Sequence, residues 1–356
     1  MRVLAIIQSW DSQDQVRGFV TGWMEKLAEK VDQLAILALE QRQPATRPNI
    51  FVYSLGKENY QGPLRRFYYL WQWHRQIRKI LALHSPQVIF THMTPIYSVL
   101  AYPYSRAAGI PVFTWFLHPR ASFITKLAHW LSTKVVSATA ASYPYKKDKL
   151  VALGHGIDTN LFTPQFSARL NPPLLISVGR ISPIKDYETI IKAAGLLKKS
   201  SGRAFQLAII GGVINAEDRV YQERLRQLVI QLNLEDSVQL APSQNQNNLV
   251  SWYQRASLHI NATQPGSGDK VNLEAMACGT PSLMASPTFS ETITPYQKQL
   301  LFHYQNPEDL SLKIMNFLAL EENQRQELGK KLREAVIEHH NLDKLMTNLV
   351  ALFKTP

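Results

Sequence analysis

This sequence is poor in cysteine and in long apolar runs. Its single cysteine, Cys278, has no partner for an internal disulfide, which excludes a disulfide-stapled scaffold. The apolar start at residues 3–7 is too short for the core of a signal peptide, and no run of 18 apolar residues occurs. These absences predict a cytoplasmic protein that does not span a membrane.

Acidic residues are scarce between positions 41 and 147, where 14 Lys and Arg residues accompany one acid, Glu58. The formal net charge of the chain is +12, and residues 1–165 carry most of it, with 19 basic and 9 acidic residues. A surplus of this size indicates a polyanionic partner such as nucleic acid, phosphates or an anionic membrane. Charge alone does not choose among them.

The chain of 356 residues has the length of two domains. Short β-rich runs alternate with longer amphipathic stretches on both sides of a polar segment that contains Pro164, Pro172 and Pro173. This alternation predicts two α/β domains with open parallel sheets. We expect a first domain at 1–164, a linker at 165–173, a second domain at 174–340, and a C-terminal helix at 341–356 that packs back across the first domain.

The segment at 177–186 reads Ser-Val-Gly-Arg-Ile-Ser-Pro-Ile-Lys-Asp and lies between an apolar strand and a helical run. α/β proteins bind ligands at the carboxyl ends of their strands. We therefore predict that Arg180 and Lys185 hold a diphosphate and stabilise charge as it leaves. The alternative is a solvated loop with two surface cations and Pro183 opening the helix.

A glycine-rich loop follows a later strand, within residues 263–281. Such a loop leaves backbone N–H groups free to bind hydroxyls or phosphate at the start of the next helix. Glu274 lies in the first turns of that helix, where it could accept hydrogen bonds from a ribose. The alternative is an acid favoured near the positive end of a helix. Cys278 is read as a small buried apolar residue rather than a nucleophile.

Together these segments resemble the retaining glycosyltransferases of family 4, or glycosyl transferases group 1. The resemblance covers most of residues 150–285. It rests on Gly154-His155-Gly156-Ile157-Asp158, Val178-Gly179-Arg180 with Lys185, Ile209-Ile210-Gly211-Gly212 and Leu273-Glu274-Ala275-Met276-Ala277-Cys278-Gly279-Thr280-Pro281. It implies the GT-B fold, an α/β architecture in which two Rossmann-like parallel-sheet domains face a central cleft.

The resemblance also implies a hexosyltransferase-type enzyme whose donor is a UDP- or GDP-linked sugar, with no required cofactor. Arg180 and Lys185 would bind the diphosphate, and Glu274 would bind the ribose. The base would lie against Ala241, Pro242 and Ser243. The other donor-site residues that it implies are Gly18, Gly179, Gly211, Gly212, Gly266, Ser267, Gly268, Asp269, Lys270 and Val271.

The first domain offers two histidines. His118 follows a strand that resembles the one facing the donor sugar in the family, which makes it a catalytic candidate. His92 is an acceptor-side candidate. A structural role is the alternative for both.

The family's pair of glutamates is incomplete, because Gly266 occupies the place of the first one, eight residues before Glu274. The Gly-Ser-x-Asp-Lys version found here resembles one branch of the family. We hypothesise that Asp269 supplies the missing carboxylate to the sugar hydroxyls, as a catalytic candidate beside Arg180 and Lys185. The chain also lacks the Asp-x-Asp pair by which many other glycosyltransferases hold a metal. We therefore expect no metal site, and the resemblance implies transfer with retention at the anomeric carbon.

Residues 63–79 and 120–134 mix basic side chains with aromatic ones, a composition that suits the surface of an anionic membrane. Ordinary amphipathic helices are an equal alternative. A nucleic-acid surface is a weaker one, because the nucleotide-sugar motifs already account for the cleft. We expect a peripheral enzyme on the inner membrane face that acts on a lipid-linked or polysaccharide acceptor of the cell envelope. A GT-B nucleotide-sugar epimerase and a catalytically idle nucleotide-sugar-binding protein are the alternative functions.

Overall fold

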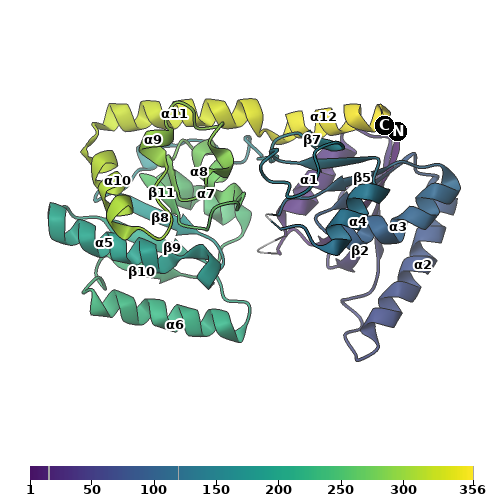
Figure 1. Ribbon diagram of the computed structural model, residues 1–356, viewed down its shortest axis with the longest axis horizontal. Coiled ribbons are helices and arrows are strands. Elements are labelled where there is room, and N and C mark those ends of the chain that lie inside the picture. The colour runs from purple at the N-terminus through teal and green to yellow at the C-terminus, as the bar shows by residue number, and fades with distance from the viewer. Residues whose placement is uncertain (15–16, 119, 356) are drawn as a thin grey trace. The chain divides into compact units, whose positions relative to one another are not determined.

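The structure is a computed structural model that describes residues 1–14, 17–118 and 120–355. The chain divides into two compact units, the first formed by Met1–Gly156 with Leu342–Pro356 and the second by Ile157–Asn341. Each unit contains one parallel sheet with helices on its faces (Figure 1). The predicted α/β class with two parallel sheets is confirmed.

The first unit has a seven-stranded sheet in the order β3-β2-β1-β4-β5-β6-β7. Its strands are β1 (Arg2–Trp10), β2 (Gln33–Gln41), β3 (Ile50–Ser54), β4 (Val88–His92), β5 (Val112–Trp115), β6 (Lys134–Ser137) and β7 (Leu150–Ala152). Its helices are α1 (Phe19–Ala28), α2 (Arg65–His84), α3 (Pro95–Ala108), α4 (Phe123–Leu131) and α12 (Leu342–Lys354).

Strand β1 shows how the core of the first unit is divided between the two faces of the sheet. Val3 and Ala5 pack in one cluster with α1 and α12, whereas Leu4 and Ile6 pack in another with α2 and α3. Successive side chains of a strand point to opposite faces, so an apolar strand with both faces buried needs helices on each side. The last helix of the chain, α12, supplies part of one of these layers; its Phe353 contacts aromatic rings of β4 and β5.

Helix α2 is buried only from Trp73 onward, through Trp73, Ile77, Ile80 and His84. The side chains before Trp73 include Phe67, which is 73% exposed. In Figure 1 the beginning of this helix projects from the rest of the first unit. The predicted segment 63–79 therefore combines a buried part with an exposed, aromatic and basic tip.

The second unit has a five-stranded sheet in the order β10-β9-β8-β11-β12. Its strands are β8 (Leu174–Val178), β9 (Gln206–Ile210), β10 (Val238–Ala241), β11 (Leu258–Asn261) and β12 (Ser282–Met284). Its α-helices are α5 (Tyr187–Ser201), α6 (Ala216–Gln231), α7 (Gln246–Arg255), α8 (Lys270–Ala277), α9 (Gln297–Leu300), α10 (Pro307–Ala319) and α11 (Glu322–His339). Its 3-10 turns are η1 (Phe166–Ala168), η2 (Pro183–Lys185) and η3 (Pro287–Phe289).

The boundary between the units lies at Gly156 and Ile157, so residues 165–173 are part of the second unit rather than the expected linker. Arg169 in this segment donates hydrogen bonds to the carbonyl of Gly279 at 2.8 Å and to the hydroxyl of Thr280 at 2.9 Å. Prolines and polar residues make the segment resemble a linker locally, but the partners of Arg169 lie more than a hundred residues further along the chain.

None of the helices within the described ranges combines the length and the apolarity that crossing a membrane requires.

Candidate functional site

The second sheet has its topological switch point between β8 and β11. The chain runs from β8 outward through β9 and β10, then returns to place β11 on the other side of β8. Open α/β sheets bind ligands outside the carboxyl ends of the strands at such a point. The loops that leave these two strands are residues 179–186 and 262–269. The two motifs singled out in the sequence therefore come together here.

The loop after β8 is fastened to the neighbouring strand end. Gly179 donates its N–H to the Ile210 carbonyl at 3.0 Å, and Ile181 donates to that of Gly212 at 2.9 Å. A Cβ atom added to Gly211 would lie only 1.9 Å from the Gly179 oxygen, so the two loops touch backbone to backbone. Gly179 itself has φ +153°, within the region that favours glycine. The loop has little freedom to move.

Lys185 ends the short turn η2 and is held at both ends of its side chain. A Cβ atom on Gly179 would lie 3.2 Å from the Lys185 Cε, so the stem of Lys185 passes over this glycine. The Lys185 Nζ donates to the Asp269 Oδ2 at 2.5 Å. Directly after Lys185, Asp186 caps α5 by accepting the Thr189 backbone N–H at 3.4 Å, and it also accepts a hydrogen bond from the Thr189 hydroxyl at 2.7 Å. The start of α5 thus fixes the turn that carries Lys185.

Asp269 is the centre of a partly buried polar network, with 19% of its side chain exposed. Its Oδ2 also accepts hydrogen bonds from Asn261 Nδ2 at 3.1 Å and Thr263 Oγ1 at 2.7 Å, and its Oδ1 accepts one from Ser267 Oγ at 2.9 Å. Burial raises the pKa of Asp269, but the charge of Lys185 and the hydrogen bonds from Lys185, Thr263 and Asn261 hold that pKa well below its usual range. The carboxylate is therefore ionised at neutral pH.

Glu274 lies on α8 and is 2% exposed. The Lys270 Nζ lies 3.2 Å from its Oε1, and the Tyr253 hydroxyl donates to its Oε2 at 3.1 Å. Burial raises the pKa of Tyr253 well above its ordinary value, with the Glu274 carboxylate adding to the shift. Burial also lowers the pKa of Lys270, against the opposing effect of Glu274. A ribose bound here would share Glu274 with these two partners.

Arg180 pairs with a different acid from Lys185, although both cations come from one loop. Its Nε lies 3.9 Å from Asp218 Oδ2, and its side chain is 43% exposed. The same oxygen of Asp218 accepts the Ile214 N–H at 3.1 Å. Arg180 therefore reaches toward the start of α6 and keeps much of its guanidinium in contact with solvent.

The sequence model of the family described as glycosyl transferases group 1 matches residues 159–335. This span contains Arg180, Lys185, Asp269 and Glu274. Residues 159–335 are a glycosyl transferases group 1 domain.

Similar proteins agree with this assignment. The D-inositol 3-phosphate glycosyltransferase of Acidothermus cellulolyticus is 32% identical over 154 residues, which cover 40% of this chain and 34% of that protein. The match thus spans about a third of that relative's length.

Two solved structures show the fold over the whole chain. Sucrose-phosphate synthase from Thermosynechococcus elongatus has a TM-score of 0.81 at 19% identity, covering 100% of this chain and 99% of that one. HepE from Anabaena, solved in complex with UDP-glucose, has a TM-score of 0.77 at 15% identity and full coverage of both chains. The chain has the GT-B fold.

In the group 1 domain, the residues predicted to face the base lie where β10 ends, next to β9. The Ala241 carbonyl accepts the Gly211 N–H at 3.1 Å, and Pro242 is exposed. In the loop before α8, Gly266 has φ +91°, so a glutamate at this position would adopt a strained backbone conformation. The backbone of this loop thus differs from one that would accept the family's first glutamate.

Three predicted residues lie in the first unit. Gly18 precedes α1, and a Cβ atom there would lie 2.5 Å from a backbone carbonyl. His92 is buried at the end of β4, where its ring stacks on Trp115 with an interplanar angle of 13°. His118 is exposed, and its Nδ1 accepts the Arg120 N–H at 3.1 Å. The packing of His92 favours its structural role, whereas the ring of His118 is open to a ligand.

Sequence reasoning missed several residues of the group 1 domain that hold the site together. Asn261 and Thr263 directly follow a strand, so their place at its carboxyl end could have indicated them. Asp218 and Tyr253 come from helices and carried no local signal.

His259 was also missed and lies on β11 with no exposure to solvent. Its Nδ1 lies 2.8 Å from Ser282 Oγ, which donates to Asn272 Oδ1. Its Nε2 has no hydrogen-bond partner among the residues that the structure describes. Burial lowers the pKa of His259 to about 3, against the opposing effect of Asp269. A neutral histidine therefore lies beneath the Lys185–Asp269 pair.

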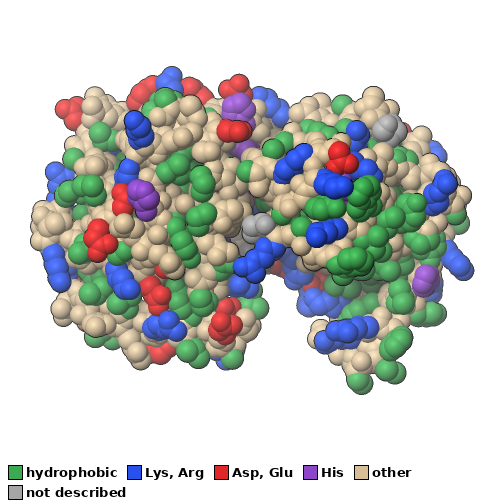
Figure 2. All heavy atoms as spheres, viewed as in Figure 1, with side chains coloured by type: hydrophobic (Ala, Val, Ile, Leu, Met, Phe, Trp, Pro, Cys, Tyr) green, Lys and Arg blue, Asp and Glu red, His purple; other side chains and the backbone are tan. Residues whose placement is uncertain are grey.

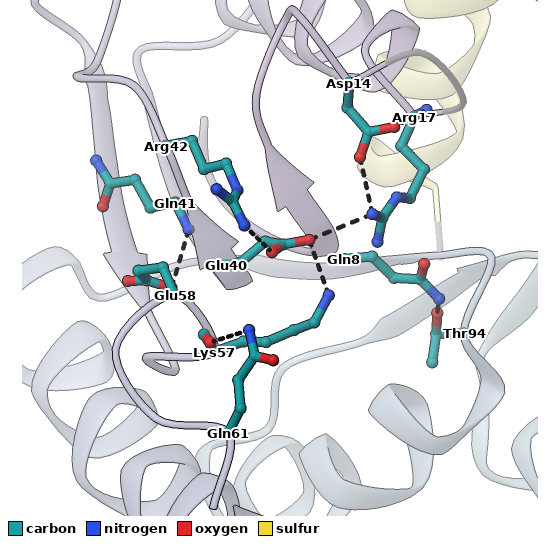
Figure 3. Close-up of polar contacts among 10 residues, drawn as sticks. All are labelled: Gln8, Asp14, Arg17, Glu40, Gln41, Arg42, Lys57, Glu58, Gln61 and Thr94. Carbon is teal, nitrogen blue, oxygen red and sulfur yellow. Dashed lines mark hydrogen bonds and ion pairs between the residues drawn. The ribbon is translucent and has the colours of Figure 1, made fainter. Parts of the chain in front are cut away.

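The first unit carries its own polar cluster, at the carboxyl end of β2 (Figure 3). Glu40 is 3% exposed there. Its Oε1 lies 3.2 Å from Arg17 Nη2 and 3.0 Å from Lys57 Nζ, and its Oε2 lies 3.5 Å from Arg42 Nη2. Arg17 also pairs with Asp14 at 2.8 Å. Three cations thus surround one buried carboxylate, and each of the three is partly exposed.

The topological switch point of the first sheet lies beside this cluster, between β1 and β4. Gln8 near the end of β1 donates to the Thr94 hydroxyl after β4 at 2.7 Å. Figure 3 labels this pair together with the cluster around Glu40. The first unit therefore also has polar groups at the position where its fold favours a ligand.

The surface of the first unit is basic and partly apolar. Figure 2 shows Asp and Glu side chains scattered over the visible face of the second unit and sparse on that of the first. The most exposed large apolar side chains of the predicted segments belong to α4 and to the beginning of α2, with Phe123 at 79% and Phe67 at 73%. Exposed basic residues accompany them, including Arg65, Arg66 and Lys126.

Proposed function

We propose that this protein is a glycosyltransferase that moves a sugar from a nucleoside-diphosphate sugar to a lipid-linked or polysaccharide acceptor. The observation that carries the proposal is the meeting of the Arg180–Lys185 loop with the Asp269–Glu274 segment at the switch point of a group 1 domain. The HepE structure, which was solved in complex with UDP-glucose, supports a donor of this class.

In the proposed reaction, Lys185 and Arg180 hold the diphosphate. An ammonium group has three N–H donors; Lys185 gives one to Asp269 and keeps two for phosphate oxygens. The exposed guanidinium of Arg180 can form bidentate hydrogen bonds to phosphate. Fixed cations stabilise the charge that develops on a leaving diphosphate, so we propose that the transfer does not depend on a metal ion.

The bond from the anomeric carbon to the phosphate oxygen breaks through an oxocarbenium-like state, and a bond to the acceptor oxygen forms on the same face. The acceptor proton passes to the departing phosphate. The anomeric configuration is retained, and no protein base is assigned. Asp269, Arg180 and Lys185 are proposed to serve this step, and His118 is proposed as a further catalytic residue.

The remaining donor contacts are proposed from the same geometry. The base, uracil or guanine, lies against the backbone of Ala241, Pro242 and Ser243 at the end of β10. Glu274 accepts a ribose hydroxyl while keeping Tyr253. The other residues proposed to line the donor site in the group 1 domain are Gly179, Gly211, Gly212, Gly266, Ser267, Gly268, Lys270 and Val271. Gly18 of the first unit remains a donor-site proposal from the sequence alone.

The first unit is proposed to bind the acceptor. Arg17, Arg42 and Lys57 outnumber the carboxylates that they contact, Glu40 and Asp14. One surplus positive charge therefore remains for an anionic group. Lipid-linked sugars carry phosphate, and the name of the Acidothermus relative includes a phosphorylated acceptor. His92 is buried and is proposed only to support the acceptor side.

We further propose that the protein works at the inner face of an anionic membrane, which it contacts through 63–79 and 120–134. Exposed Phe67 and Trp71 on α2, and Phe123 and Trp130 on α4, are between 55% and 79% exposed. Aromatic side chains beside basic ones bind the lipid interface, where each cation near the surface contributes about 1 kcal/mol.

A panel of UDP- and GDP-linked sugars tests the donor. A ligand present at 100 times its dissociation constant adds about 2.7 kcal/mol to the free energy of unfolding, and the stabilising donor is then tested for transfer to membrane extracts with and without EDTA. A panel without any stabilising ligand would overturn the proposal. Donor binding without transfer would favour an idle binding protein, and conversion of the sugar without transfer would favour an epimerase.

A further inference from the structure

The carboxylate of Asp269 has little capacity left for a ligand. A carboxylate offers about four lone-pair positions to hydrogen-bond donors. Lys185, Asn261 and Thr263 donate to Oδ2, and Ser267 donates to Oδ1. Three donors fill Oδ2, and Oδ1 keeps one position beside Ser267. Most of the hydrogen-bonding capacity of this carboxylate is therefore used by Lys185 and the surrounding loop rather than by a sugar hydroxyl.

The groups that hold Asp269 are themselves fixed. The Asn261 side-chain oxygen accepts the Thr263 N–H at 2.9 Å, which leaves its amide nitrogen pointing at Asp269. The Ser286 hydroxyl donates to the Ser267 carbonyl at 3.0 Å. The carboxylate is thus a rigid anchor on the loop after β11.

Lys185 depends on this anchor for its position. Its stem lies over Gly179, and its ammonium group lies 2.5 Å from Asp269. A lysine has a flexible four-carbon stem, and holding such a side chain in one rotamer costs conformational entropy. Because Asp269 already orders the Lys185 side chain in the unliganded protein, a ligand does not have to do so on binding.

We propose that Asp269 is a positioning residue that holds the Lys185 ammonium in place for an anionic diphosphate, rather than a residue that binds the sugar. This inference rests on the proposed function of the same site and replaces the hypothesis that Asp269 substitutes for the family's first glutamate as a sugar ligand.

The Asp269→Asn variant separates the possibilities, because it removes the anchor while making the site more positive by one charge. If charge alone mattered, the variant would bind anions more tightly. If Asp269 positions Lys185, inorganic pyrophosphate and UDP-glucose both bind about three- to tenfold more weakly, since the lysine must be ordered on binding. If Asp269 contacted the sugar, only the affinity for UDP-glucose would fall.

Isothermal titration with inorganic pyrophosphate and with UDP-glucose measures these affinities in wild type, Asp269→Asn, Lys185→Met and the double variant. The effect of Asp269→Asn on pyrophosphate should vanish in the Lys185→Met background; a loss that persists there would show a general structural role and overturn the proposal. Unchanged or tighter pyrophosphate binding in Asp269→Asn would also overturn it. Glu223→Gln makes the same charge change on an exposed part of α6 and should have no effect.

A second readout needs no nucleotide. Acylation of Lys185 by an amine-reactive reagent, followed by mass spectrometry, should be faster in Asp269→Asn than in wild type, and an equal rate would overturn the proposal. If wild type binds neither ligand, the proposed function fails and this labelling still decides the role of Asp269. Thr263→Val keeps the charge and removes one hydrogen bond, so it should show a smaller effect in the same direction if Asp269→Asn does not fold.

Discussion

Replacing Gly211 with alanine should push the Lys185 loop away from β9. A Cβ atom at this position would lie 1.9 Å from the carbonyl oxygen and 3.0 Å from the carbonyl carbon of Gly179. Both neighbours are backbone atoms, so no flexible side chain can move aside. The backbone at Gly179 must shift, and Lys185, whose stem passes over Gly179, must shift with it.

The expected loss follows from the contacts that the shift disturbs. Overpacking a close contact costs about 1–3 kcal/mol. The hydrogen bonds from Gly179 to Ile210 and from Ile181 to Gly212 hold the loop, and each contributes about 1 kcal/mol. With partial relaxation, Gly211→Ala should lose about 2–4 kcal/mol. At about 2–4 °C per kcal/mol for a unit of this size, its transition should fall by roughly 5–15 °C.

Calorimetric unfolding of wild type and Gly211→Ala measures this loss, together with titration of the stabilising nucleotide. Gly22→Ala is the matched control, because a Cβ atom on Gly22 in α1 meets no atom within 4 Å. That change should stabilise α1 by about 0.5–1 kcal/mol. A Gly211→Ala protein with the melting temperature and nucleotide affinity of wild type would refute the close approach of the two loops.

Three further predictions follow from the described contacts. The depressed pKa of His259, about 3 because of burial, means that its stabilising contribution is complete above pH 6.5 and is lost as the pH falls. Urea unfolding should therefore show wild type losing about 1.4 kcal/mol per pH unit relative to His259→Gln between pH 6.5 and 4.5, and parallel pH profiles would contradict this. Tyr253→Phe leaves the buried Glu274 without one of its hydrogen-bond donors, so the free energy of unfolding should fall by about 1–3 kcal/mol in the same urea experiment. An unchanged free energy of unfolding would contradict this. Charge reversal of Arg65 and Arg66 should abolish sedimentation of the protein with anionic liposomes. Charge reversal of two exposed arginines on α6 is the control and should leave sedimentation unchanged. Sedimentation that persists in the Arg65 and Arg66 variant would count against membrane docking.

The order of strands and helices could be predicted from the sequence because it depends on local patterns. The strand expected before the glycine-rich loop of residues 263–281 is β11, and alternation of apolar strands with amphipathic helices led to two parallel sheets. The expected linker was placed wrongly, because a local pattern does not reveal that Arg169 bonds to Gly279 and Thr280. Contacts across more than a hundred residues decide which segments belong to a unit.

The candidate site likewise has features that could be predicted from local sequence and features that could not. The strand, turn and helix around Lys185, and the loop before α8, could be predicted because each is continuous in sequence. The ion pair between Lys185 and Asp269 could not be predicted, because these residues are 84 positions apart in the sequence. They meet only because β11 pairs with β8. The burial of Glu274 against Tyr253 was missed for the same reason.

Charge in the group 1 domain is balanced where the diphosphate is proposed to bind. Lys185 pairs with Asp269, Arg180 with Asp218, and Lys270 with Glu274, so each of these cations has a carboxylate from another part of the domain or the next helical turn. An anion gains little from the net charge of such a site, and its affinity must come from N–H groups that are already aimed at it. The surplus that gives the chain its net charge of +12 belongs mainly to residues 1–165. We therefore propose that the basic residues of the first unit act on the acceptor or the membrane surface, whereas at the proposed donor site the position of each cation matters more than the number of cations.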